Sequence, residues 1–423
     1  MKQTHLICIC WLLIFSIQTA STQNPVGVLS VNISGVPAGV NSSLKMTGPK
    51  GFARILQRSE KLTNLEDGVY EFTSEVIIQR EPLISKAFRL NNLQMKHTIK
   101  RDTQSINFVY RQMPGSDKIW LGNQTAPAGQ NLHIQAYSNE NITSTSTIEP
   151  SVRLTSRVTS LRWLAFDDQG NLWTADAGNI KMYAWNTLGD TNVGASITIA
   201  HEATCLAFDA DGNLWFSDGK KASKIMRIPK ARLNQSGGNK TDITLSGPSF
   251  DGAQGIAFDR DGNLWAGNYN KSDVVKIPRA MLAESNTAVD GLTSITCESK
   301  PPVVSVLRAP KALAFDKQGN LWVGYFGPNV IAQIPANQLN QTTKFKPDIQ
   351  ITLSVGVLLQ QMAFDEDGSL WTALSGGSFG KINSTQLTSG GKLTPEVIIK
   401  SNQLKYGSGL AIYPPPLNFP LKQ

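Results

Sequence analysis

LAFDDQGNLW, at residues 164–173, is the first of five copies of one phrase, and these copies decide the fold. The others are LAFDADGNLW (206–215), IAFDRDGNLW (256–265), LAFDKQGNLW (313–322) and MAFDEDGSLW (362–371). In each copy the apolar triplet predicts a buried strand, Asp-x-x-Gly a tight reversal and Leu-Trp the start of the partner strand. Five such β-hairpins cannot each bury a core alone, so we expect them to stack on one another.

The two ends of this region carry the halves of a sixth copy. Residues 118–123 resemble the Leu-Trp strand, and residues 409–413 resemble the apolar first strand. Pairing them would close a ring and remove its free sheet edges. With Trp-to-Trp spacings of 42, 50, 57 and 49 residues, this predicts a six-bladed β-propeller over residues 118–416, with a split closing blade. Third strands are expected at 180–185, 224–228, 274–277, 330–334 and 379–382.

Residues 25–112 contain no copy of the phrase. Their short alternating runs, separated by turn residues, predict a β-sandwich domain, and the whole chain is therefore expected to be all-β. Residues 113–117 are expected to form a short linker. The expected strands of the sandwich are 26–36, 43–48, 52–58, 70–79, 84–90 and 104–110.

The first 21 residues have the pattern of a secretory signal peptide. Lys2 and His5 precede an apolar run at 6–15, and small residues follow at 19–21. The run is too short to span a bilayer, which needs about 20 apolar residues. We therefore expect a secreted or periplasmic protein with no membrane span after removal of the signal.

The formal net charge of +8 is spread without a run of Lys or Arg. An exported chain of this kind is not expected to bind nucleic acid. A modest positive bias suits an anionic partner, although a solvated surface explains it equally well.

Cys205 and Cys297 remain after signal removal and would be able to form a disulfide in an oxidising compartment. The position of Cys205 on an apolar strand favours a buried free thiol instead.

The repeated Asp and Trp residues have two interpretations each. Asp-x-Asp-Gly turns such as Asp209/Asp211 suggest Ca²⁺ binding, but a Ca²⁺ loop needs six to eight oxygen ligands, and Gln169 and Gln318 replace the second Asp in two copies. Turn chemistry is therefore favoured. The Trp residues would serve as sugar-stacking platforms or as packing between blades, and one Trp per blade beside Leu favours packing.

Variation between the copies points to the mouth of the central channel as a ligand site. Two sets of positions are expected to meet there, because the first strand leads away from one face and the second strand returns to it. The set entering the first strand is Arg162, Glu202, Gln254, Lys311, Gln360 and Ser408. The set following the Leu-Trp strand is Asn123, Asp176, Asp218, Asn268, Tyr325 and Leu374.

The repeat resembles the NHL-type, regucalcin/gluconolactonase-like and streptogramin-lyase-like propellers, which have phrases close to G-[IL]-A-x-D-x-x-G-N-[LI]-[WY]. The resemblance covers residues 118–416. In addition, Leu62, Leu65 and Gly68-Val-Tyr70 resemble a signature of bacterial secreted carboxypeptidase-regulatory-like sandwich modules. The resemblance implies the fold; for function it leaves lactonases, lyases and binding proteins open.

The enzymatic members of this group imply specific site residues. The lactonase branch holds a divalent cation with Glu, Asn and Asp, for which this chain offers Glu202, Asp176, Asp218, Asn123 and Asn268 without a local family motif. The lyase branch uses a Glu and two His residues, whereas this chain has four His residues and no Glu-x-His pair.

We therefore expect an exported, non-catalytic binding protein without a cofactor. Its partner would be a protein, a peptide, or a polar small molecule or glycan outside the cytoplasm. The alternative is a metal-dependent hydrolase or lyase that uses a divalent cation such as Ca²⁺ or Mg²⁺ in the channel.

Overall fold

The computed structural model describes residues 27–124, 134–154, 160–176, 178–191, 193–219, 223–238, 240–301 and 306–417. Within these ranges the chain is all-β, with short 3-10 turns and no α-helix. Accordingly, no helix in the described ranges has the length and apolarity needed to cross a membrane. The predicted signal peptide at 1–21 lies outside the described residues.

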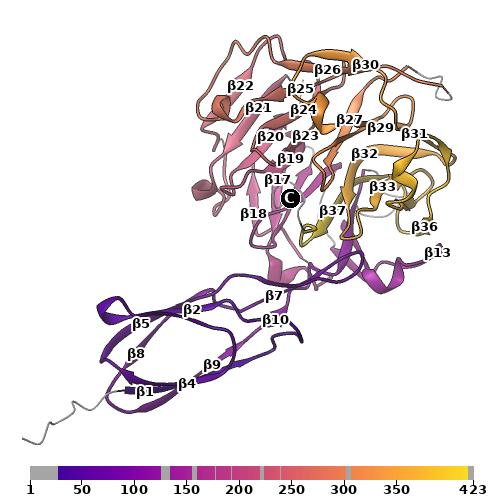
Figure 1. The fold of residues 1–423 in the computed structure, drawn as a ribbon. Helices are drawn as coiled ribbons and strands as arrows, with labels where there is room; N and C mark the ends of the chain where they lie inside the picture. The colour runs from indigo at the N-terminus through magenta and orange to yellow at the C-terminus, as the bar shows by residue number, and fades with distance from the viewer. Residues whose placement is uncertain are drawn as a thin grey trace, which may run out of the picture.

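The N-terminal region (residues 27–112) holds three small sheets, with strand orders β4-β1-β9, β3-β2-β5-β8 and β10-β7-β6. It is the indigo lobe in Figure 1. Leu29, Val31, Met46, Tyr70 and Phe72 are buried in its core. The strands are β1 (Gly27–Ser34), β2 (Leu44–Thr47), β3 (Ala53–Leu56), β4 (Glu60–Leu65), β5 (Gly68–Thr73), β6 (Ile77–Gln79), β7 (Lys86–Arg89), β8 (Gln94–Ile99), β9 (Thr103–Val109) and β10 (Arg111–Gln112).

The described strands from Lys118 onward form six sheets of four or five strands, which we call the ring region (residues 118–416). Three sheets take four consecutive strands, two others (β27-β28-β29-β31 and β32-β33-β34-β36) skip one strand, and the sixth combines β37 with β11, β12 and β14. Strand β11 pairs with β37 in antiparallel register, with Trp120 opposite Ala411, as the sequence predicts. The expected third strands are also present, at β17, β21, β25, β29 and β34.

Each sheet has the same order from the middle of the ring region outward. The innermost strands are β15 (Leu161–Phe166), β19 (Ala203–Phe208), β23 (Ala253–Phe258), β27 (Pro310–Phe315), β32 (Val357–Phe364) and β37 (Gly407–Tyr413). The second strands are β16 (Leu172–Asp176), β20 (Leu214–Asp218), β24 (Leu264–Asn268), β28 (Leu321–Tyr325), β33 (Leu370–Leu374) and β11 (Lys118–Asn123). The third strands are β17 (Asn179–Tyr183), β21 (Lys224–Ile228), β25 (Asp273–Ile277), β29 (Val330–Ile334), β34 (Ser378–Ile382) and β12 (Ile134–Ser138).

Outer strands complete the sheets and connect neighbours. They are β18 (Ile197–Ile199), β22 (Ile243–Ser246), β26 (Thr293–Cys297), β31 (Gln350–Leu353), β36 (Val397–Lys400) and β14 (Val152–Leu154). Three outer strands gain a parallel partner from the next sheet's segment of chain, so hydrogen bonds join these sheets at the periphery. The added strands are β13 (Ser146–Thr147), β30 (Thr343–Phe345) and β35 (Gly391–Leu393).

The innermost strands contact one another in a closed cycle, β15 to β19, β23, β27, β32, β37 and back to β15. Figure 1 shows several of these strands around the middle of the ring region. The cycle closes through β37, whose sheet also contains β11, β12 and β14, so the two ends of the ring region meet in one sheet.

The Asp of each repeated phrase organises its turn. Asp259 accepts hydrogen bonds at Oδ1 from the backbone N–H groups of Asp261 (3.0 Å) and Asn263 (2.9 Å). Its other oxygen accepts the indole N–H of Trp265 at 2.9 Å. The same Trp-to-Asp bond recurs in all five copies. The Asp therefore satisfies buried donors that would otherwise be costly, which supports the turn interpretation.

The repeated Trp residues pack between neighbouring sheets, as the sequence predicts. Trp215 meets Phe258 of the next sheet edge-on, with ring centroids 6.3 Å apart. Equivalent T-shaped pairs join Trp120 to Phe166, Trp173 to Phe208, Trp265 to Phe315 and Trp322 to Phe364. Edge-to-face pairs of this kind add about 0.5–1.5 kcal/mol beyond burial.

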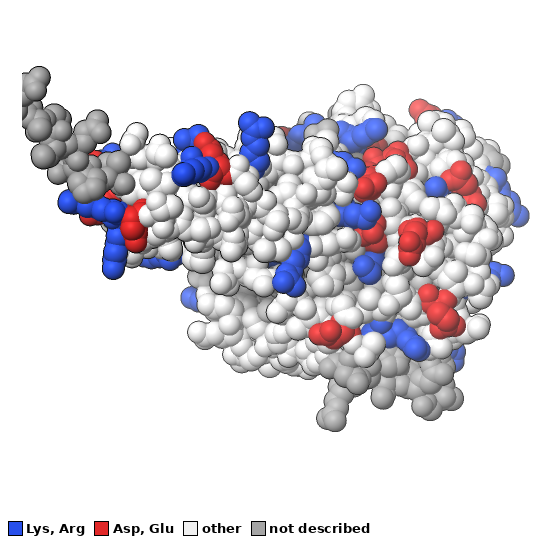
Figure 2. All heavy atoms as spheres, turned by 90° about the horizontal axis from the view of Figure 1, so that it is seen from below, with Lys and Arg blue, Asp and Glu red and all other residues white. Residues whose placement is uncertain are grey.

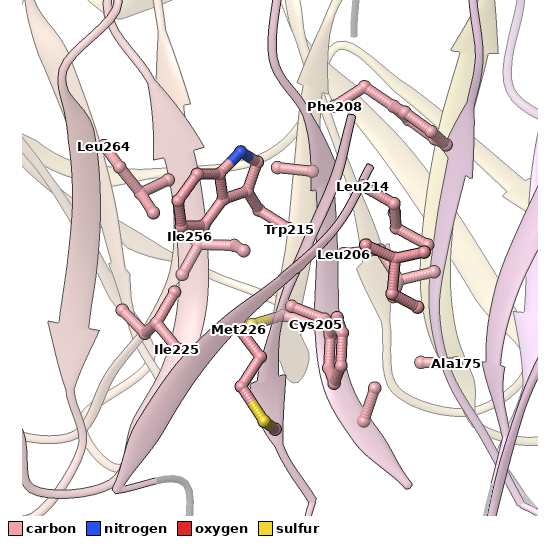
Figure 3. Close-up of a cluster of buried hydrophobic side chains, with 14 of the residues drawn as sticks. Ala175, Cys205, Leu206, Phe208, Leu214, Trp215, Ile225, Met226, Ile256 and Leu264 are labelled. Atoms are coloured by element: carbon pink, nitrogen blue, oxygen red, sulfur yellow. The ribbon is translucent and has the colours of Figure 1, made fainter. Parts of the chain in front are cut away.

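Cys205 is a free, buried thiol, and so is Cys297. Figure 3 shows Cys205 among Trp215, Met226 and Ile256, inside the cluster between the second and third sheets. Burial raises the pKa of Cys205 to about 11 and that of Cys297 to about 12, so both thiols stay protonated at neutral pH.

The N-terminal region is fixed to the ring region on the side of the repeated turns. Glu366, in the turn after β32, accepts hydrogen bonds from Arg80 (2.5 Å), Ser85 (2.5 Å) and the backbone N–H of Leu417 (3.0 Å). Arg89 donates to the carbonyl of Gln169 at 3.0 Å and lies 4.3 Å over the Trp185 ring.

The predicted linker at 113–117 is part of this contact. Met113 is fully buried in the cluster around Trp120 and Tyr413, and the carbonyl of Gly115 accepts the Trp120 indole N–H. The segment connects the two regions, and Met113 and the Gly115 carbonyl also pack against the last sheet of the ring region.

Candidate functional site

The innermost strands carry a bulge at the end that points away from the repeated turns. In β15, Leu161 lies opposite Asp176 and Trp163 opposite Ala175, so Arg162 has no partner in the ladder. Gln254 in β23 and Lys311 in β27 have the same place in their strands. Because β-bulges bend a strand and redirect a side chain, each sheet presents its bulged residue at this end of the channel.

The register corrects one member of the first predicted set. Arg162, Gln254 and Lys311 all lie four residues before the Phe of their strand, and the corresponding residue of β19 is Thr204. Glu202 precedes the strand and lies beyond the bulge. It still belongs to the same end of the channel, because its carboxylate lies 3.4 Å from the Arg162 guanidinium.

The second predicted set lies opposite the first residue of each innermost strand, and most of it is buried. Asn123 donates to the carbonyl of Gln403 and accepts from the backbone N–H of Lys405. Asp176 accepts from the backbone N–H of Ser160 (3.0 Å) and from Lys181 (2.8 Å).

Asn268 likewise accepts from the backbone N–H of Asp251 and donates to the carbonyl of Ser249. Tyr325 and Leu374 are buried in apolar clusters, and Asp218 is partly exposed opposite Ala203. The expectation of an open polar ring therefore needs correction for Asn123, Asp176, Asn268, Tyr325 and Leu374. The side chains of Asn123, Asp176 and Asn268 are held by hydrogen bonds to neighbouring segments, and those of Tyr325 and Leu374 pack in apolar clusters.

The bulged end holds two cationic side chains. Arg162 is 29 % exposed and forms an ion pair with Glu202, whose side chain is 24 % exposed. Lys311 is partly buried, and its Nζ lies 4.8 Å from the centroid of the Phe326 ring. Burial, and next to it the positive charge of Arg162, lowers the pKa of Lys311 to about 8. The positive charge of Arg162 therefore repels the protonated amine of Lys311 across the channel.

Neutral polar groups complete this end of the channel. Gln254 is partly exposed, and Gln360 donates a hydrogen bond to Gln124 at 2.9 Å. Ser408 is buried and donates to the carbonyl of Leu161 at 2.5 Å, so its hydroxyl links two innermost strands. Of the first predicted set, Arg162, Glu202, Gln254 and Lys311 are partly exposed and remain candidates for ligand contact, whereas Gln360 and Ser408 are buried and hydrogen-bonded within the protein.

Farther along the channel the lining becomes apolar. Gln361 donates to the carbonyl of Leu164 (2.7 Å) and accepts from the N–H groups of Leu164 (3.1 Å) and Leu410 (2.9 Å). Beyond it lies a cavity of about 70 Å³, lined by apolar residues of all six innermost strands and covered by Pro415 and Pro416. Among the described residues, no charged side chain lines this cavity, whereas Arg162, Glu202 and Lys311 lie at the bulged end.

Three residues of this region are absent from the sequence prediction. Thr204 follows from counting back four residues from the Phe of each phrase, so a signal for it exists. Phe326 follows Tyr325 directly, and among the other copies only the one ending in Asn268 has an aromatic residue, Tyr269, at this place. Gln361 precedes the apolar triplet by one residue, and nothing in the sequence indicates that its amide joins three strands.

The metal alternative requires Glu202, Asp176 and Asp218 to converge on one ion. Asp176 already accepts from Ser160 and Lys181, and Glu202 is paired with Arg162. In the described part of the chain, no three His, Cys, Asp or Glu side chains form a group suited to hold a metal ion. The donor set therefore does not fit a cation without rearrangement of these pairs.

The surface also bears on possible partners. Figure 2, which views the molecule from below, shows blue and red residues interspersed over the ring region on that face. No large area of one sign is visible there.

Comparisons with known proteins give distant structural likenesses. Neither a protein-family model nor a curated protein matches the chain. Among solved structures, virginiamycin B lyase from Staphylococcus aureus is 18 % identical, with 53 % of this chain and 67 % of that chain covered and a TM-score of 0.35. A protein of unknown function from Bacteroides caccae is 14 % identical, covers 70 % of this chain and 98 % of that chain, and has a TM-score of 0.46.

The WD40 β-propeller domain of Doa1 is 9 % identical, with 72 % of this chain and 86 % of that chain covered and a TM-score of 0.41. Likenesses this distant carry nothing about what this chain binds or catalyses. The sheets and their closed cycle of contacts make the larger part of the chain a β-propeller.

Proposed function

We propose that the protein is an exported, non-catalytic binding protein that takes a polar ligand at the bulged end of its propeller channel. The N-terminal region is a β-sandwich module of the carboxypeptidase-regulatory-like kind. The ring region is a six-bladed propeller of the NHL or regucalcin/gluconolactonase-like kind, and its closing blade is split between β11 and β37. Export follows from the signal-peptide pattern of residues 1–21.

One observation carries the proposal. The bulged residues of the innermost strands differ from sheet to sheet, and two of them, Arg162 and Lys311, are cations that act on each other across the channel. A strand that needs only to pack has no use for such residues, because a charge that is partly removed from water lowers stability. A polar ligand at this end offers the missing compensation.

The position of the N-terminal region also favours the bulged end of the channel as the ligand site. Its contacts run to the turns at Gln169 and Glu366, at the opposite end of the innermost strands. The bulged end therefore faces away from this module. This arrangement suits a protein whose sandwich serves as a spacer and whose far face meets the partner.

The test is the thermal transition of the purified protein, with and without EDTA and with Ca²⁺, Mg²⁺ or Mn²⁺ added. The proposal expects the midpoint to stay the same under all these conditions. It also expects no turnover of lactone or ester substrates. A metal-dependent rise that disappears in Asp218→Ala, together with turnover, would overturn it in favour of a metal-dependent hydrolase or lyase.

A further inference from the structure

Lys311 forms no salt bridge with any carboxylate in the described part of the chain. The contact of its Nζ is with the face of the Phe326 ring, at 4.8 Å. A cation over an aromatic ring gains about 0.5–2 kcal/mol, whereas partial removal of an unpaired charge from water costs more than that. The fold does not need a lysine here, since Thr204 and Gln254 have the same place in their strands. The lysine therefore indicates a ligand contact.

The charges that face Lys311 come from three elements. Arg162 on β15 is positive and lowers the pKa of Lys311 after burial, and Cys205 on β19 is the other group that acts on it. Cys205 is a neutral thiol at neutral pH, because burial raises its pKa to about 11. Glu202 carries one negative charge and is paired with Arg162. Within the group formed by Lys311, Arg162 and Glu202, two cations and one carboxylate leave one positive charge uncompensated.

We propose that this end of the channel binds a monovalent organic carboxylate, held between the Lys311 ammonium and the Arg162 guanidinium. The inference rests on the proposed function and names the class of ligand for the same site. One negative charge matches the uncompensated charge, and a carboxylate accepts strong charge-assisted hydrogen bonds from both cations. The Phe326 ring offers a partly exposed apolar surface for the body of the ligand.

The proposal has a pH signature. Burial and the Arg162 charge hold the pKa of Lys311 at about 8, so the free protein loses this proton in mildly alkaline solution. A bound carboxylate stabilises the protonated amine and raises that pKa again. Affinity is therefore full at neutral pH and falls as the pH rises through about 8 and beyond.

The experiment is a calorimetric titration of the purified protein with sodium benzoate, with benzamide as the neutral analogue. Ionic strength is held constant with chloride, and buffers contain no carboxylate. Lys311→Met and Arg162→Gln remove the two cations. Lys276→Met is the matched control, because Lys276 also lies over an aromatic ring, that of Trp265 at 5.7 Å, but on a third strand away from the channel.

We expect benzoate to bind and benzamide not to bind. Lys311→Met and Arg162→Gln should each weaken benzoate about tenfold or more, as expected for a lost hydrogen bond to a charged group. Lys276→Met should bind like the unmodified protein. The affinity of the unmodified protein should fall between about pH 7 and about pH 9.5.

Equal binding of benzoate and benzamide, or full binding by Lys311→Met, would overturn the inference. Tighter binding of inorganic phosphate than of benzoate would also overturn it, because a divalent anion exceeds the local positive charge. If a neutral polar compound binds here and carboxylates do not, the inference fails and the proposed function stands. Metal-dependent turnover, by contrast, would contradict the proposed function itself.

Discussion

The indole Nε1 of Trp265 donates a hydrogen bond to Oδ2 of Asp259 across 2.9 Å, and the two residues are six positions apart in the sequence. The same carboxylate accepts two backbone N–H groups of its own turn. One Asp thus satisfies a turn and a buried indole together. This relationship explains why the phrase keeps its Asp and its Trp in every copy.

Replacing Asp259 should therefore destabilise the fold. Asp259→Ala removes the acceptor of four donors, and we expect a loss of about 3 kcal/mol in the free energy of unfolding. Asp261→Ala is the control, because Asp261 is exposed and only its backbone contributes to the turn. Denaturant unfolding of both variants measures the difference. Equal losses, or a loss reproduced by EDTA, would instead favour a Ca²⁺ loop.

Lys311 should reduce the stability of the fold at neutral pH. Because its pKa in the folded protein is lowered to about 8 from 10.5, the unfolded chain binds more protons between those values. The contribution of Lys311 to the free energy of unfolding therefore becomes more favourable as the pH increases from about 8 to about 10.5. Lys311→Met should raise the unfolding free energy at pH 7 by about 2 kcal/mol and remove this dependence.

The control for that change is Lys276→Met, which should leave the pH dependence intact. Unfolding midpoints in urea at several pH values provide the measurement. A lower stability of Lys311→Met at pH 7 would mean that the lysine has a structural role, which the account does not allow.

The innermost strands approach too closely for a side chain at Gly255. A methyl group there would lie 1.9 Å from the carbonyl oxygen of Lys311, on the neighbouring strand. Gly255→Ala should cost about 3 kcal/mol, since backbone on both sides must move. Gly238→Ala, where no atom lies within 4 Å, should be close to neutral. Similar thermal midpoints for the two variants would contradict this close approach.

The contact between the N-terminal and ring regions depends on Glu366. Glu366→Ala removes the acceptor of Arg80, Ser85 and the Leu417 N–H, with an expected loss of about 2 kcal/mol. In the exposed pair of Arg54 and Glu60, the same substitution of Glu60 should cost only a few tenths of a kcal/mol. A double-mutant cycle with Arg80→Ala measures the coupling across the contact. Zero coupling would contradict a contribution of the pair of Arg80 and Glu366 to this contact.

The repeated phrase made the ring region predictable, because each hairpin carries its own turn chemistry and packing residues. The pairing of β11 with β37 followed from two incomplete copies. In the N-terminal region the strands β4 and β8 were missed, since Glu60–Leu65 and Gln94–Ile99 are mostly polar and alternate weakly. The expected strand 70–79 is two strands, because Ser74, Glu75 and Val76 interrupt the ladder.

The candidate site was predictable only in part. Variation between copies pointed to Arg162, Gln254, Lys311 and Gln360, because bulged residues do not pack and are free to differ. The second set was misjudged, since polar residues such as Asn123 and Asn268 were taken to face solvent. Their buried hydrogen bonds go to loops of irregular length, which carry no periodic signal.

The most direct test of the account is the pKa of Lys311 itself, measured by NMR titration of lysine side chains labelled with ¹³C, with Lys311→Met used for assignment. The account predicts a pKa of about 8 in the free protein and a clearly higher value in the presence of benzoate. A pKa near 10.5 in the free protein, or a low value that benzoate leaves unchanged, would contradict a channel end built around an uncompensated cation.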